Sequence, residues 1–144
     1  MGGKKIKLLT PAICNFELPS NHCNITCNDN FADLIIPYLY LGDEANSLDN
    51  KFLTEKNIKV IICVAKEVKN NITRQIQRHQ IPFIDGGNSR IDKYLEEIIK
   101  LLDSYRQKKE NVLVHCQMGV SRSVSFVIVY LLYLSIGVFL LNML

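Results

Sequence analysis

The sequence predicts an α/β fold in which helices flank a central sheet of mixed or mostly parallel strands. Two compact runs of β-branched and apolar residues, 60–64 and 112–114, are typical of strands buried on both faces. An amphipathic helical pattern lies between these runs, over residues 91–105. Strands that alternate with helices pair in parallel within one covered sheet, so these patterns predict a layered α/β domain.

The predicted domain covers residues 33–144. The preceding residues, 1–32, contain three lysines and two prolines without apolar periodicity, which predicts a polar, flexible leader. Residues 34–36 and 39–41 flank Pro37 and predict a short edge strand that ends in a turn at Gly42. The remaining short elements are a helix over 48–56, a second strand over 81–84 and a loop over 85–89.

The helix over 91–105 has the clearest pattern. Charged residues occupy its polar face, Asp92 is predicted to cap its start, and Arg106 suits its end because cations favour helix C-termini. A wholly apolar helix over 124–134 follows the strand 112–114. The apolar positions of the first helix are Ile91, Tyr94, Leu95, Ile98, Ile99, Leu102 and Tyr105.

The amino-acid composition and net charge argue against several classes of protein. The 144 residues suffice for one domain, and 17 basic against 14 acidic residues leave a net charge of +3, too small to predict nucleic-acid binding. The N-terminus lacks the apolar run of a signal peptide, so we expect a cytoplasmic or nuclear protein with reduced thiols. His22, Cys23 and Cys27 could supply three metal ligands, but a structural zinc site needs four, and no metal is predicted.

Reactive chemistry is predicted for the segment His115–Ser123, HCQMGVSRS, between the strand 112–114 and the apolar helix. A loop around a helix N-terminus directs backbone N–H groups at a bound anion, and the helix dipole adds positive potential. Such a cradle fits a phosphate and stabilises a thiolate, which makes Cys116 the candidate nucleophile. The predicted backbone donors of the cradle are Gln117, Met118, Gly119, Val120 and Ser121.

Three side chains complete this predicted site. Arg122 offers a planar fork that matches two phosphate oxygens. Ser123 can donate its hydroxyl to the cysteine sulfur and steady it as a leaving group. His115 is predicted to orient the loop through a hydrogen bond.

The HCxxGxxRS pattern resembles the active-site loop of the cysteine-dependent protein tyrosine phosphatase superfamily. Within it the chain is most similar to the compact dual-specificity phosphatases, over residues 33–134. Residues 36–42 resemble the opening strand of that family, and 81–85 resemble the strand that delivers its general acid. The resemblance implies a tyrosine phosphatase-like fold and, at the family's spacing before the cysteine, Asp85 as acid and then base.

The function that the resemblance implies is hydrolysis of phosphotyrosine and of phosphoserine or phosphothreonine in phosphoprotein substrates. The reaction would pass through a cysteinyl-phosphate and use no metal or cofactor. Two alternatives stay open: a catalytically weak or inactive truncated form that binds phosphate groups, and a phosphatase acting on RNA 5′ ends or phosphoinositides. The second would usually carry further Lys or Arg in the loop, and positions 117–121 are uncharged.

The C-terminus departs from the family pattern. Residues 124–144 carry no charge and are long enough to span a bilayer. Residues 124–134 are similar to the buried central helix of the family, whereas 135–144 form an atypical hydrophobic tail in place of its closing helices. We favour a C-terminal truncation that lacks these helices over membrane contact through 135–144.

Three further residues have simpler interpretations. Cys63 is predicted to be an inert core thiol, in preference to a disulfide partner for Cys116. His79 is predicted to be exposed, without a catalytic role, because it lies among polar residues. Arg90 is predicted to be a solvated surface cation.

Overall fold

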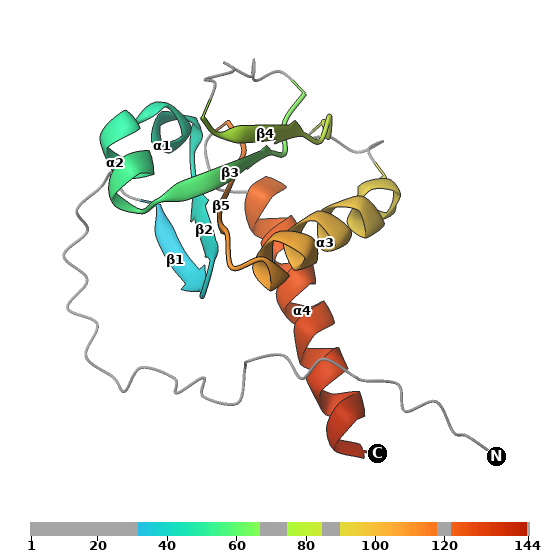
Figure 1. Cartoon of the computed structure of the whole chain (residues 1–144). Helices are drawn as coiled ribbons and strands as arrows, with labels where there is room; N and C mark the ends of the chain where they lie inside the picture. Colours follow the sequence, from blue (N-terminus) through green and yellow to red (C-terminus); the bar gives the residue numbers. More distant parts are fainter. Residues whose placement is uncertain (1–31, 67–74, 85–89, 118–121, 144) are drawn as a thin grey trace, which may run out of the picture.

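The computed structural model describes residues 32–66, 75–84, 90–117 and 122–143, so almost all of the predicted leader lies outside the described residues. Its centre is a five-stranded mixed sheet with the order β1-β2-β5-β3-β4 (Figure 1). The first two strands are antiparallel, and the pairs β2–β5, β5–β3 and β3–β4 are parallel. The predicted α/β class is therefore confirmed. The strands are β1 Asp33–Ile36, β2 Leu39–Gly42, β3 Ile58–Cys63, β4 Gln77–Gln80 and β5 Asn111–His115.

Both faces of the sheet are covered by helices (Figure 1). Helices α1 (Glu44–Leu48) and α2 (Asn50–Glu55) cover one face, and α3 (Asp92–Gln107) and α4 (Arg122–Met143) cover the other. Alternate residues of a strand point to opposite faces, and this divides Ile58, Val60, Ile61 and Ile62 of β3 between two apolar clusters. Ile61 packs with Phe52 of α2, whereas Val60 and Ile62 pack with the residues of α3 and α4.

The helix predicted over 48–56 is wrong in its bounds, because two short helices, α1 and α2, meet at Asp49. The backbone of Asp49 is extended, with φ −80° and ψ 96°, which ends α1 and prevents one continuous helix. The Asp49 carboxylate then accepts hydrogen bonds from the backbone N–H groups of Lys51 at 3.0 Å and Phe52 at 3.2 Å. Asp49 therefore stops one helix and caps the next.

The strand predicted over 81–84 is also wrong, since β4 comprises the preceding polar residues Gln77–Gln80. Polar side chains are compatible with this position because β4 is an edge strand and its residues are exposed or half-buried. The backbone N–H of Ile81 still donates to the carbonyl oxygen of Cys63 at 2.8 Å. Pro82 has no N–H to continue the ladder, so the apolar residues that follow leave the sheet.

The amphipathic helix is confirmed as α3, but its predicted cap is not. Ile91 occupies the N-cap position and makes no capping hydrogen bond through its side chain. Asp92 lies in the first turn, where its carboxylate forms an exposed ion pair with Arg90, at 2.7 Å between Nη2 and Oδ2. The negative charge of Asp92 still suits the positive end of the helix dipole.

The last helix is longer than the apolar helix predicted over 124–134. Phe126, Val127 and Tyr130 are buried against the sheet and α3, as the prediction requires, and the Tyr130 hydroxyl donates to Asp103 of α3 at 3.3 Å. Beyond Leu134 the helix continues to Met143 and extends away from the sheet (Figure 1). By length and composition alone, α4 could cross a membrane.

Candidate active site

The candidate site lies where the parallel strands end. Gly42 of β2 and Cys63 of β3 are both in register with His115 of β5. Ligand sites of open α/β sheets form outside these carboxyl ends, because the loops that leave adjacent strands meet there. Cys116 and Gln117 follow β5 directly, and Glu44 at the start of α1 donates its backbone N–H to the Gln117 carbonyl oxygen at 3.4 Å.

The Cys116 sulfur lies at the first turn of α4. Cys116 is 3% exposed and packs with Cys63 and Ala65. The fully buried Ser123 hydroxyl donates a hydrogen bond to Cys116 Sγ across 3.3 Å. Ser123 is the second residue of a 22-residue helix, so the positive end of the helix dipole is close to the sulfur. This environment favours a negative charge on sulfur, which a nucleophilic thiolate requires.

Arg122 is the first residue of α4 and is buried. Its Nη1 donates to the carbonyl oxygen of Phe83 at a distance of 3.5 Å. Phe83 also packs edge-to-face on Phe126 of α4, with 5.4 Å between the ring centroids. The start of α4 is thereby connected to the segment that leads toward residue 85.

His115 is 1% exposed and lies at the end of β5. Its Nδ1 is 3.0 Å from the carbonyl oxygen of Cys116, and because a carbonyl can only accept, Nδ1 carries the proton. Burial lowers the pKa of His115 below its ordinary value, and Arg78 adds to this lowering, while the Cys116 carbonyl and Asp43 oppose it. The imidazole is therefore neutral at pH 7 and holds the Cys116 backbone in place.

Sequence reasoning missed Arg78, whose half-buried guanidinium acts electrostatically on this region. Its Nη2 donates to the carbonyl oxygen of Ser47 in α1 at 3.0 Å. Burial lowers the pKa of Arg78, and its charge interacts with Cys63 and His115. The pairing of β4 with β3 places Arg78 opposite Ile61, two residues before Cys63. No local pattern signals this role, because only the strand pairing brings the cation beside β3.

The exposed position predicted for His79 is wrong. The side chain is half-buried, and its Nε2 lies 2.7 Å from the hydroxyl of Tyr105 in α3. Burial lowers the pKa of His79, and the charge of Glu97 partly offsets this effect. His79 thus joins β4 to α3. Arg90 is exposed, in agreement with its predicted place on the surface.

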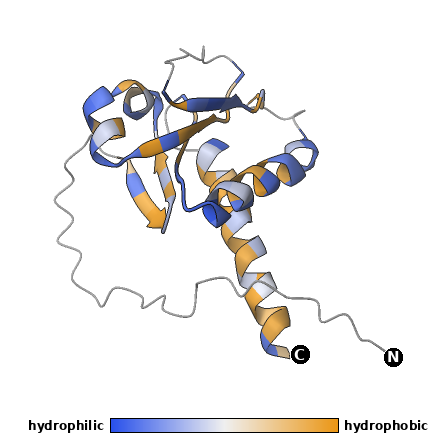
Figure 2. Ribbon diagram, in the orientation of Figure 1, coloured by the Kyte–Doolittle hydropathy of each residue, from blue (hydrophilic) through white to orange (hydrophobic). Residues whose placement is uncertain are grey.

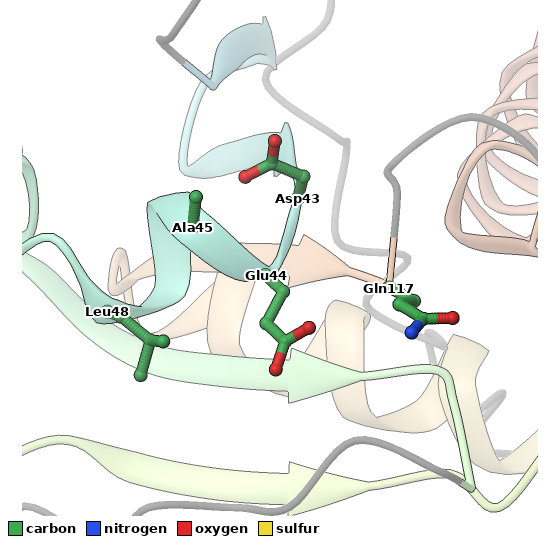
Figure 3. A pocket seen from close by; sticks show the side chains of 5 residues that line it. All are labelled: Asp43, Glu44, Ala45, Leu48 and Gln117. Atoms are coloured by element: carbon green, nitrogen blue, oxygen red, sulfur yellow. The ribbon is translucent and has the colours of Figure 1, made fainter.

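A pocket of about 420 Å³ opens beside Gln117, between the start of α1 and the end of β5 (Figure 3). It is lined by Asp43, Glu44, Ala45, Leu48 and Gln117. Gly42 precedes the first lining residue, and a Cβ on it would come within 2.6 Å of Asn46 Oδ1 and 2.8 Å of Ala32 Cβ. The pocket therefore lies next to the Cys116 segment, and its lining includes the acidic residue Glu44 and the apolar residues Ala45 and Leu48.

Several predicted site residues lie outside the described residues: Asp85, Met118, Gly119, Val120 and Ser121. The same is true of the weighed metal ligands His22, Cys23 and Cys27. Within the part of the chain that the structure describes, no group of three or more His, Cys, Asp or Glu side chains could hold a metal ion. The structure does bring His115, Cys116, Arg122 and Ser123 together at one end of β5 and α4.

Comparison with known proteins identifies the family. Residues 39–135 match the domain family described as "Dual specificity phosphatase, catalytic domain". The chain is 36% identical over 96 residues to protein phosphatase Slingshot homolog of Xenopus laevis, covering 67% of this chain and 14% of that protein. It is 36% identical over 100 residues to dual specificity protein phosphatase 7 of Homo sapiens, covering 68% of this chain and 24% of that protein.

Solved structures agree with this assignment. The crystal structure of DUSP15 matches with a TM-score of 0.67 and 29% identity, over 70% of this chain and 64% of that one. The crystal structure of a human tyrosine phosphatase-like serine/threonine/tyrosine-interacting protein matches with a TM-score of 0.65 and 27% identity. The match covers 71% of this chain and 72% of that one. The aligned region spans 14% and 24% of the two curated relatives named above. Sequence and fold together show that the chain belongs to the dual-specificity phosphatases, within the protein tyrosine phosphatase superfamily.

Proposed function

We propose that this chain removes phosphate from phosphotyrosine and from phosphoserine or phosphothreonine in proteins, through a cysteinyl-phosphate intermediate. The observation that carries the proposal is the position of Cys116 Sγ, at the first turn of α4 and 3.3 Å from the Ser123 hydroxyl. A buried cysteine with only a packing role has no need of a hydroxyl donor and a helix N-terminus at its sulfur.

In the first proposed step the Cys116 thiolate attacks phosphorus. The S–P bond forms as the bond from phosphorus to the substrate oxygen breaks, and Asp85 gives its proton to that leaving oxygen. Arg122 holds two of the phosphate oxygens through its planar fork. Backbone N–H groups of residues 117–121 stabilise the charge that develops on the phosphoryl group.

In the second proposed step water attacks the cysteinyl-phosphate. Asp85, now a carboxylate, takes a proton from the water as the S–P bond breaks and inorganic phosphate forms. The electron pair of that bond returns to sulfur, which leaves as a thiolate. The Ser123 hydroxyl donates a hydrogen bond to this leaving sulfur, and His115 orients the Cys116 backbone throughout.

The test is hydrolysis of p-nitrophenyl phosphate by the purified chain, with and without vanadate. Cys116→Ser should abolish turnover because a neutral hydroxyl is a far weaker nucleophile than a thiolate. Asp85→Asn should lower kcat by about 10² or more, the usual effect of losing a general acid. Cys63→Ser is the matched control, since it removes the neighbouring thiol, and it should retain turnover.

Phosphopeptides then test the substrate class. Paired peptides that differ only in carrying phosphotyrosine or phosphothreonine should both release phosphate, and release should disappear with Cys116→Ser. A chain that unfolds cooperatively and shows no turnover on any of these substrates would refute the enzymatic proposal. Tight binding of the same phosphopeptides by such an inactive chain would support the phosphate-binding alternative.

A further inference from the structure

Two buried side-chain atoms near the Cys116 segment have no hydrogen-bond partner among the described residues. They are Nε of Arg78 in β4 and Nε2 of His115 in β5. The two atoms are complementary, because an arginine Nε carries a proton, whereas Nε2 of His115 has a lone pair when the ring proton is on Nδ1. Buried polar atoms are usually paired, so two complementary exceptions beside a nucleophile call for an explanation.

Strand pairing places Arg78 and His115 on the same face of the sheet. Arg78 is in register with Ile61 of β3 and His115 with Cys63, and residues two apart along a strand point to the same face. β3 lies between β4 and β5, so the two backbones are two strand spacings, about 10 Å, apart. Figure 2 shows hydrophilic β4 beside the predominantly apolar β3, which makes Arg78 a cation at the margin of an apolar sheet.

The guanidinium of Arg78 extends under α1. Its Nη2 donates to the carbonyl oxygen of Ser47 in that helix at 3.0 Å. The start of α1 is bound to the segment after β5, since the backbone N–H of Glu44 donates to the Gln117 carbonyl oxygen at 3.4 Å. The same short helix therefore contacts both the guanidinium and the segment that follows His115.

The charge of Arg78 acts on the His115 ring. Burial lowers the pKa of His115 most, the hydrogen bond to the Cys116 carbonyl raises it, Arg78 lowers it further, and Asp43 raises it. Among the described residues, these two charged groups and the thiols of Cys63 and Cys116 surround the ring. A nearby cation disfavours a second ring proton and favours a lone pair that faces it.

We propose that Arg78 is a positioning residue for the proposed reaction, because its guanidinium faces Nε2 of His115 and keeps the ring proton on Nδ1. From there the proton is donated to the Cys116 carbonyl oxygen, 3.0 Å from Nδ1. A proton on Nε2 instead would leave this carbonyl without its donor. The inference rests on the proposed function, in which Cys116 is the nucleophile whose backbone this hydrogen bond holds.

NMR spectroscopy tests the proposal without any need for turnover. The ring nitrogen and carbon-bound proton resonances of His115 report its tautomer and its charge, and the spectrum of His115→Asn identifies them among the three histidines. The wild-type ring should be neutral, with its proton on Nδ1, and should gain a second proton only below the ordinary pKa of 6.5. Arg78→Met removes the cation, so protonation should move to higher pH and part of the population should carry the proton on Nε2.

Hydrolysis of p-nitrophenyl phosphate connects the tautomer with catalysis. Arg78→Met should lower kcat/KM by up to about tenfold, the equivalent of one hydrogen bond. Arg78→Lys keeps the cation and should restore the wild-type tautomer and most of the rate. Lys59→Met is the matched control, because it removes a cation from an exposed position of the neighbouring strand β3, and it should change neither the resonances nor the rate.

A wild-type His115 with its proton on Nε2, or one that gains a second proton above pH 6.5, would overturn the proposal even if Arg78→Met does not fold. A folded Arg78→Met with wild-type resonances would also overturn it and leave Arg78 only the structural role of joining β4 to α1. Failure of the proposed function is distinguishable from these results. A wild type without turnover concerns the enzymatic activity, whereas the resonances of His115 decide whether Arg78 sets its tautomer.

Discussion

The hydroxyl of Ser123 has a defined partner in the structure, the sulfur of Cys116 at 3.3 Å. A hydrogen bond to a charged group contributes about 1.5–3 kcal/mol, so it stabilises a leaving thiolate more than a sulfur bonded to phosphorus. Ser123→Ala should therefore slow breakdown of the cysteinyl-phosphate by about tenfold to hundredfold and leave its formation less affected. Stopped-flow measurement with p-nitrophenyl phosphate should show a burst of p-nitrophenol followed by a slow steady state.

The same helix provides the control for this prediction. Ser135 also donates its hydroxyl within α4, to the carbonyl oxygen of Leu131 at 2.8 Å, and its side chain is exposed. Ser135→Ala should keep the wild-type steady-state rate. A Ser123→Ala variant in which burst and steady state slow equally would contradict a role in the second step.

The residues of the candidate site could be predicted only where they lie close together in the sequence. His115, Cys116, Arg122 and Ser123 fall within nine residues, at the end of β5 and at the start of α4. Arg78 could not be predicted, because its influence on His115 depends on the pairing of β4 with β3 and on burial. Register between distant strands leaves no trace in the sequence around Arg78.

At the level of elements, Asp49 determines where two helices divide. Its carboxylate accepts from two backbone N–H groups at the start of α2, which would otherwise lack an intrahelical partner. Asp49→Ala should lower the free energy of unfolding by about 1 kcal/mol, the usual loss for an N-cap aspartate. Urea denaturation followed by circular dichroism measures this change.

Asp92→Ala is the comparison that separates a cap from a surface ion pair. Asp92 makes an exposed ion pair with Arg90 and does not occupy the N-cap position of α3. Water screens an exposed ion pair, so it contributes little to stability, and this variant should lose less stability than Asp49→Ala. The reverse order of the two losses would show that the assignment of the caps is mistaken.

The elements that could be predicted well from the sequence are those whose apolar residues recur at helical spacing or form an uninterrupted run. The helix α3 and the buried strands β3 and β5 have such patterns, and all three are confirmed within a few residues. β4 was misplaced because an edge strand need not be apolar, and the apolar residues after it serve another purpose. Phe83 packs on Phe126 and accepts from Arg122, so its apolar character reflects tertiary contacts beyond the sheet.

At the scale of the whole described domain, the two large apolar clusters lie on opposite faces of the sheet, and the same strands contribute residues to both. Leu113 and Ile61 belong to the cluster under α2, and their strand neighbours Val112, Val114 and Ile62 belong to the cluster under α3 and α4. Loss of the helices on one face would therefore remove packing from strands that also carry the cluster on the other face. We therefore expect the described domain to unfold as one cooperative unit, in which a local titration affects global stability.

Stability should fall as the pH is lowered, because burial lowers the pKa of both His115 and His79 in the folded chain. Below the ordinary histidine pKa of 6.5 the unfolded chain binds protons that the folded chain still refuses. The stabilising contribution is therefore complete above about pH 6.5 and is lost as the pH falls toward the lower folded values. Urea titrations between about pH 7.5 and about pH 5, above the range of most carboxylates, measure it.

Two variants test which histidine causes this dependence of the unfolding free energy on pH. His115→Asn keeps a side-chain N–H donor for the Cys116 carbonyl but cannot titrate, so it should remove most of the dependence on pH. His79→Asn should remove less, because the His79 side chain is only half-buried and Glu97 opposes the lowering of its pKa. Unfolding free energies that rise on acidification, or a slope that survives both substitutions, would mean that other groups control the acid response. If His115→Asn removes more of the pH dependence than His79→Asn does, the neutral, buried His115 both anchors the Cys116 backbone and is the main acid-sensitive group of the fold.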